Sequence, residues 1–217
     1  MNINRLGGFV YWITEWIMRL AYVQFLWIVF IILGLGVFGF FPSTAAMFSV
    51  TRKWVSGEGD IPIFITFWQS YKKEFFKVNT LGWILLAMAY FLYSDFKFFT
   101  FGESTIFSIF KIIISIVFYL FLTMCIYFFP IYVHFQYKFL NYIKYSFLYS
   151  FVSPMKTVGL FLVTIGMYYL FLKMPVLFLF FSGSTISFVW MSVVYKVLEK
   201  GTAKSELSKN SKSIDKV

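Results

Sequence analysis

Five long runs of apolar residues, separated by shorter polar stretches, set the pattern of this 217-residue chain. A helix needs about 20 mostly apolar residues to cross the hydrocarbon of a bilayer, and the second and fourth runs fall slightly short of that length. Within each run the apolar positions are continuous, which favours helices over strands of alternating polarity. We therefore predict an all-α, polytopic membrane protein with about five transmembrane helices, at residues 21–41, 78–94, 112–129, 157–172 and 175–195.

The connection between the first two runs has an amphipathic pattern. Pro42 is predicted to end the first span, because proline lacks an amide donor and disfavours helix in the residue before it. The serine or threonine that follows would cap a short helix, which Gly57 would end. Asp60 and Pro62 would open a second helix, with aromatic residues on one side and lysines on the other. This pattern predicts amphipathic helices at the cytoplasmic interface, which either contact lipid directly or pack against the bundle.

Composition and charge agree with a surface that faces lipid. The chain is 60% hydrophobic and 13% charged, and its formal net charge is +10. Soluble domains carry about 25% charged residues. The cations stand at the ends of apolar runs and in the tail, which favours anionic lipid headgroups over nucleic acid as their partner.

The distribution of cations predicts an orientation. With the N-terminus outside and the C-terminus inside, 14 of the 19 Lys and Arg residues lie in cytoplasmic segments, where such residues are enriched. Residues 42–77 and 130–156 and the tail are then cytoplasmic. The predicted domain organisation is one membrane-embedded helical domain over residues 1–200, followed by a Lys- and Ser-rich disordered tail over 201–217.

Two sets of residues are candidates for a binding surface. The first is a cationic, aromatic surface for a partner protein or lipid headgroups, formed by Arg52, Lys53, Trp54, Lys72, Lys73 and Lys77. The second is a face for close helix packing or for a polar solute, since small residues let helices approach and hydroxyls bond neighbouring helices in lipid. It consists of Gly34, Gly36, Gly39, Pro42, Ser182, Ser184 and Ser187.

Catalytic chemistry is poorly represented in the chain. There is one histidine, His134, and one cysteine, Cys125, so a multi-ligand zinc site of His and Cys cannot form within one chain. Glu15 precedes Arg19 by four residues, the spacing of a helical ion pair. No acid lies deep in a span, where coupled pumps usually place one. We expect no catalytic residues, no metal and no cofactor.

The two halves of the chain share a pattern that suggests a parallel hairpin repeat. "FFP" occurs at residues 40–42 and 128–130, and the later entrances "NTLG" at 79–82 and "KTVG" at 156–159 are alike. Each short span is predicted to continue into its cytoplasmic helix. This predicts long helices from about residue 64 through the second span and from about 140 through the fourth, the latter broken near Pro154.

The stretch "GFFPSTAAMFSVTRKWVSGEGDIPIFITFWQSYKKEFFKVNTLGWIL", residues 39–85, resembles the YesL-like family of bacterial membrane proteins, a family of unknown function. The resemblance rests on the glycine before Phe-Phe-Pro, the Ala pair, Arg-Lys-Trp, Pro62, Phe67-Trp68 and the lysine run. It implies the bacterial cytoplasmic membrane and a link to carbohydrate uptake and polysaccharide degradation.

Two functions follow as hypotheses. The first is a non-enzymatic accessory protein of carbohydrate uptake or the cell envelope, which binds a partner such as the subunits of a carbohydrate ABC permease. The alternative is a small transporter or channel for a polar or sugar-like solute, built as a homo-oligomer. A membrane enzyme is the weakest of the hypotheses, because the chain offers no cluster of catalytic groups.

Overall fold

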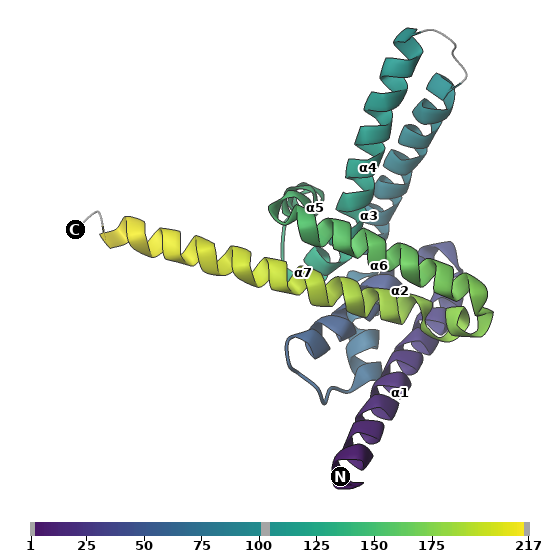
Figure 1. Cartoon of the computed structure of the whole chain (residues 1–217), viewed down its shortest axis with the longest axis vertical. Coiled ribbons are helices and arrows are strands. Elements are labelled where there is room, and N and C mark those ends of the chain that lie inside the picture. Colours follow the sequence, from purple (N-terminus) through teal and green to yellow (C-terminus); the bar gives the residue numbers. More distant parts are fainter. Residues whose placement is uncertain (1–2, 101–104, 215–217) are drawn as a thin grey trace. The chain divides into compact units, whose positions relative to one another are not determined.

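The computed structural model describes residues 3–100 and 105–214, and every regular element in these ranges is an α-helix (Figure 1). This confirms the all-α fold class. The elements are α1 (Ile3–Leu33), α2 (Val37–Val55), α3 (Ile63–Thr100), α4 (Thr105–His134), α5 (Asn141–Val152), α6 (Pro154–Lys173) and α7 (Pro175–Ile214).

Five of these helices are long and apolar enough to cross a membrane, which confirms a polytopic membrane protein with five candidate spans. Four of them extend beyond the predicted bounds, because the helices continue past the most apolar residues, whereas the first begins and ends earlier than predicted. The candidate spans are Val10–Leu33, Ile63–Thr100, Thr105–His134, Pro154–Lys173 and Pro175–Glu199.

The chain divides into two compact units. Unit 1 contains Met1–Phe75 and Phe161–Val189, and unit 2 contains Phe76–Leu160 and Trp190–Val217. The prediction of a single domain over residues 1–200 stays a prediction. α7 continues as helix to Ile214, which differs from the disorder predicted after residue 200.

The first helix ends earlier than predicted. α1 stops at Leu33, and the chain turns through Leu35 and Gly36, whose φ angles of 58° and 75° cannot continue a right-handed helix. Pro42 therefore does not end a helix, and instead lies inside α2, as Pro130 lies inside α4. The residues after Pro42 are helical as well, so they do not cap a new helix.

The far end of α2 follows the prediction. Gly57, with φ of 95°, comes just after the C-cap Ser56. The amide of Gly57 donates to the carbonyl of Trp54 at 3.2 Å, and the amide of Glu58 donates to that of Lys53 at 3.0 Å. This pair of bonds is the Schellman arrangement that stops a helix at glycine.

In unit 1, α2 folds back along α1. The indole of Trp27 donates to the Thr44 hydroxyl at 3.1 Å, and further along both helices Trp16 contacts Trp54 with ring centroids 5.6 Å apart. Because later residues of α2 meet earlier residues of α1, the two helices are antiparallel. They share a core with the start of α3, made of Val23, Leu26, Phe30, Ala46, Met47, Val50, Trp54, Phe67 and Tyr71.

In unit 2, polar side chains connect α4, α5 and the start of α6. The hydroxyls of Tyr127 and Thr157 are 2.9 Å apart, and Thr157 also donates to the carbonyls of Ser150 and Ser153. α5 and α6 are separated at Ser153, which confirms the predicted break near Pro154.

The uninterrupted α3, Ile63–Thr100, confirms the other predicted long helix. The repeat itself stays a prediction. Its two halves differ locally, because a turn precedes the first "FFP" whereas the second lies within the unbroken α4.

Candidate functional site

A cluster of charged residues fixes the turn between α2 and α3 against α1. Glu15 and Arg19 form the predicted ion pair at helical spacing. The Arg19 guanidinium also donates to the Asp60 carboxylate at 3.1 Å and to the carbonyl of Gly59 at 2.8 Å. Asp60 therefore binds Arg19 rather than starting a helix. No signal in the sequence links these residues, because they stand 41 positions apart.

These contacts correct the predicted orientation. Residues that share a hydrogen bond cannot lie on opposite faces of a bilayer. The prediction that Arg19 is outside while residues 42–77 are cytoplasmic is therefore wrong for the turn at Gly59 and Asp60. It failed because it placed a complete span between Arg19 and this turn.

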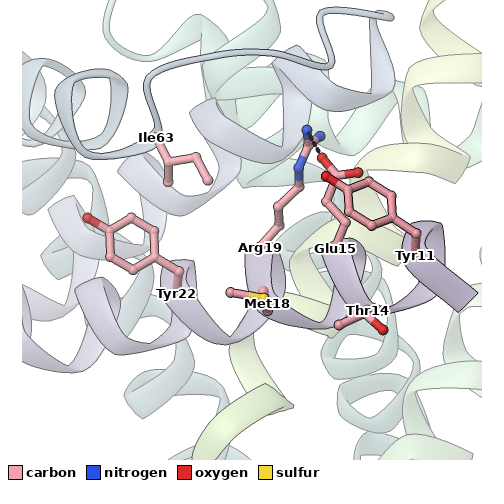
Figure 2. Close-up of a pocket in the computed structure, with 7 residues that line it drawn as sticks. All are labelled: Tyr11, Thr14, Glu15, Met18, Arg19, Tyr22 and Ile63. Carbon is pink, nitrogen blue, oxygen red and sulfur yellow. Dashed lines mark hydrogen bonds and ion pairs between the residues drawn. The ribbon is translucent and has the colours of Figure 1, made fainter.

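A cavity of about 450 Å³ opens beside this cluster. Figure 2 shows Tyr11 and Tyr22 toward its two ends, with Glu15 and Arg19 between them and Ile63 facing them from the start of α3. Its volume is within the range of small-molecule sites, about 300–1,000 Å³. Aromatic rings beside charged hydrogen-bonding groups can hold a polar ligand. The lining residues are Tyr11, Thr14, Glu15, Met18, Arg19, Tyr22 and Ile63.

The predicted cationic surface is only partly a surface. Arg52 is exposed and Lys53 is half-buried, whereas Trp54 is 6% exposed and packs in the core of unit 1. The prediction that Trp54 belongs to this surface is therefore wrong. It lies on the buried face of α2 that it shares with Met47, about two turns earlier, so its position on the helix decides its burial rather than its charged neighbours in sequence.

The lysines of α3 divide between the two units. In unit 1, Lys72 is exposed, and its ammonium lies 4.7 Å from the centre of the Trp68 ring. Lys73 lies 4.0 Å from the carboxylate of Glu74. In unit 2, Lys77 is half-buried and serves an internal contact rather than an open surface.

That contact centres on the hydroxyl of the buried Tyr142. It accepts hydrogen bonds from the Lys77 ammonium and from the Tyr137 amide, both at 3.0 Å, and donates to the Phe135 carbonyl at 3.3 Å. Burial, together with Tyr149, Tyr145 and Tyr142 nearby, raises the pKa of the Tyr137 phenol.

The predicted glycine face allows close backbone approach in the α1–α2 turn. A Cβ on Gly39 would lie 2.5 Å from the carbonyl oxygen of Ile31, and one on Gly34 would lie 2.6 Å from the hydroxyl of Tyr71. Gly36 has open space around it and is needed for its positive φ instead. Pro42 is buried in the same helix.

Two of the three candidate serines of α7, Ser182 and Ser184, contact Gln24 of α1. The Gln24 side-chain oxygen accepts from the Ser184 amide at 2.9 Å, and its nitrogen lies 3.5 Å from the Ser182 hydroxyl. The Ser187 hydroxyl donates to the Ser184 carbonyl within α7. Ser182 and Ser184 therefore take part in helix packing, and Ser187 is buried and bonded within its own helix. Gln24, the partner of these serines, was not among the residues predicted for this face.

Metal-ligating side chains do not cluster in the part of the chain that the structure describes. Within residues 3–100 and 105–214, no group of three His, Cys, Asp or Glu side chains comes together. The ring of His134 contacts Phe135 and Tyr195 edge-on. The absence of a metal, cofactor or catalytic group in the whole protein stays a prediction.

The helices and candidate spans define the class as a multi-pass, all-α membrane protein. Within that class, the chain belongs to the YesL-like family, whose function is unknown. The family model described as "Protein of unknown function, DUF624" matches residues 20–96.

Three relatives come from Bacillus subtilis (strain 168), and each is described as an uncharacterized protein. YteU is 41% identical over 86% of this chain and 83% of its own length. YesL is 34% identical over 89% of this chain and 91% of its own length. YesV is 32% identical over 87% of this chain and 91% of its own length. No solved structure matches the chain significantly.

Proposed function

We propose that this protein is a non-enzymatic accessory protein of the bacterial cytoplasmic membrane, which binds a partner in carbohydrate uptake or the cell envelope. The observation that carries the proposal is the ordered polar turn after α2. Arg19 holds its backbone at Gly59, and the Schellman bonds fix its start at Gly57. An exposed turn that is already ordered loses little entropy when a partner binds it.

The turn is suited to a partner with both charges. Arg52 and Lys53 stand on one side of Ser56 in the chain, and Glu58 and Asp60 stand on the other. All except the half-buried Lys53 are exposed. Complementary charges on a permease subunit would set the orientation and association rate of the complex. In this proposal the turn and the lysine-rich C-terminus are cytoplasmic, as the excess of cations predicts. Lys72, whose ammonium lies over the Trp68 ring, then extends toward the lipid headgroups.

The test is purification of the tagged full-length chain from native membranes in mild detergent. Arg52→Glu with Lys53→Glu should reduce the recovery of permease subunits about tenfold or more, since like charges across an interface cost several kcal/mol. Lys138→Glu with Lys144→Glu is the matched control, because both lysines are exposed and belong to unit 2. Equal recovery with both double variants would contradict the proposal.

The cavity beside Arg19 favours the alternative function, transport of a polar or sugar-like solute. Two tyrosines and a charged pair line it, a combination that suits stacking and hydrogen bonding to a sugar. Uptake of radiolabelled neutral sugars into proteoliposomes tests this. Tyr11→Ala with Tyr22→Ala should abolish uptake and leave partner recovery unchanged. Absence of uptake by the wild-type protein would contradict the transport hypothesis.

A further inference from the structure

The antiparallel α1–α2 pair has its polar groups at one end. Arg19 of α1 bonds to Gly59 and Asp60, which follow α2 in the chain. Arg52, near the end of α2, is exposed close to the same turn. Arg19 and the end of α2 therefore lie at the same level, and α1 extends beyond this level toward Ile3.

The opposite end of the pair, its tip, is apolar and exposed. Leu33 is 68% exposed, Leu35 is 84% exposed and Phe38 is 51% exposed. A turn between helices in water usually contains polar residues together with glycine or proline. Residues 31–41 read "IILGLGVFGFF" and contain no polar side chain. This end is built for contact with hydrocarbon.

Six backbone amides of the tip donate to carbonyls within the protein. The amides of Gly34, Leu35 and Gly36 donate to the carbonyls of Phe30, Ile32 and Ile31 at 3.0, 3.0 and 2.8 Å. The next amides are satisfied too, because Val37, Gly39 and Phe40 donate to carbonyls at residues 35 and 36. Inside a bilayer each polar backbone group must find a partner within the protein, and these amides do.

A groove of about 550 Å³ lies beside the tip. The Tyr71 hydroxyl in its lining donates to the carbonyl of Phe30 at 3.3 Å, so it needs no water as a partner. Acyl chains of the surrounding lipid would fill such a groove without leaving a polar group unpaired. Its lining residues are Phe30, Leu33, Gly34, Leu35, Phe38, Trp68, Tyr71 and Phe75.

Measured from the level of Arg19 to the tip, the pair is shorter than the hydrocarbon core. From Arg19 to the end of α1 at Leu33 the helix rises about 21 Å, and from Val37 to Arg52 α2 rises about 22 Å, at 1.5 Å per residue. The hydrocarbon core is about 30 Å thick. Each arm ends roughly 8 Å short of the opposite surface.

From these observations we propose that α1 and α2 form a re-entrant hairpin, whose tip at residues 33–38 lies in hydrocarbon and whose ends both lie on the cytoplasmic face. The cation count supports this placement. If α3, α4, α6 and α7 cross the membrane and the hairpin does not, both chain termini are inside. Then 13 of the 19 Lys and Arg residues lie on the cytoplasmic side, Lys97, Lys111 and Lys173 lie outside, and Lys72, Lys73 and Lys77 lie within α3.

The exposed lysines of unit 1 fit the hairpin. Lys72 directs its ammonium over Trp68, toward the end of α3 where Ile63 lies near Arg19. Long cationic side chains bend toward the headgroups in this way. Lys73 is accompanied by the Glu74 carboxylate, and a pair of opposite charges is easier to place at depth than a single one.

The test is cysteine labelling of the full-length protein in a Cys125→Ser background, in intact cells and in inside-out vesicles. A membrane-impermeant maleimide should label Thr14→Cys and Ser56→Cys only in inside-out vesicles, like the tail reference Ser205→Cys. Leu35→Cys should be labelled at less than a tenth of that level in either preparation. A small permeant maleimide should label it after detergent extraction.

Labelling of Thr14→Cys from outside intact cells would overturn the proposal. Efficient labelling of Leu35→Cys from either face would also overturn it, because the tip would then lie in water. A spin label on Leu35→Cys provides an independent measurement. Its collisions with oxygen should exceed those with a water-soluble nickel chelate, and the reverse ratio would overturn the proposal. Neither experiment involves a partner, so its failure is distinguishable from failure of the accessory function.

Discussion

Replacing Gln24 by leucine tests how α1 and α7 are held together in unit 1. Gln24 is 2% exposed and connects the two helices through the Ser184 amide. Leucine keeps a side chain of similar size and removes both polar groups of the amide. The variant therefore isolates the hydrogen bonds from the packing around them.

The expected cost is modest. The bond to the Ser184 amide is short, at 2.9 Å, whereas the Ser182 contact at 3.5 Å is at the limit of a hydrogen bond. Hydrogen bonds between helices in membranes average about 0.6 kcal/mol and reach about 1.7. Gln24→Leu should therefore lower the free energy of unfolding by about 1 kcal/mol. Gln24→Ala also removes packing and should cost about 2–4 kcal/mol, as large-to-small core substitutions do.

Gly183 provides a double-mutant cycle for the same contact. A Cβ on Gly183 would lie 3.1 Å from the Gln24 side-chain oxygen and 3.4 Å from the terminal methyl of Met47. Gly183→Ala should destabilise the wild-type protein, because the amide must shift. In the Gln24→Ala background the oxygen is gone and the same substitution should cost less. The coupling should be about 0.5–3 kcal/mol, the range for residues in contact.

The assay is reversible unfolding in mixed micelles with increasing dodecyl sulfate, followed by tryptophan fluorescence. Gly166→Ala is the control, because a Cβ at Gly166 would meet nothing within 4 Å. Two results together would refute the reasoning: Gln24→Leu at least as stable as the wild type, and additive effects at positions 24 and 183. They would mean that Gln24 does not connect the helices in the membrane.

Three further predictions use the same unfolding assay. Gly39→Ala should destabilise by about 1–3 kcal/mol, because its Cβ would lie 2.5 Å from a backbone oxygen, and stability equal to that of Gly166→Ala would contradict the turn. Tyr142→Phe should cost about 1–3 kcal/mol, since it leaves half-buried partners without their hydrogen bonds, and a neutral result would contradict the hydrogen-bonded centre of unit 2. Burial raises the pKa of Tyr137 above its usual 10, so the folded state retains its proton longer than the unfolded state does. Stability should therefore decline as pH rises above about 10, less so in Tyr137→Phe, and an equal decline in both proteins would contradict this assignment.

Much of the architecture was predictable from local pattern. Continuous apolar runs indicated helices of membrane length, and all five correspond to candidate spans. Gly57 ended α2 as predicted, and the helix through the second span was continuous as predicted. These features depend on the chemistry of neighbouring residues, which a single sequence contains.

The candidate sites were less predictable, because they depend on residues far apart in the chain. The Glu15–Arg19 pair was found from its spacing, but the contact of Arg19 with Asp60 needed the return of α2 along α1. Gln24 was not predicted as a contact residue, because its partners in α7 depend on how the helices pack. Trp54 was placed with its cationic neighbours, whereas the core determined its burial.

The sequence by itself determined that this chain is helical and membrane-embedded, since the length of an apolar segment and its lack of charge are properties of that segment alone. Only the tertiary structure decided where the first helix ends and on which side the next turn lies. Pro42 is a strong local breaker, yet the positive φ angles at Leu35 and Gly36 moved the turn six to seven residues earlier. A proline inside a helix removes one backbone hydrogen bond. Glycines at the turn allow α1 and α2 to pack closely along their length, and this packing stabilises the pair by more than the lost bond costs.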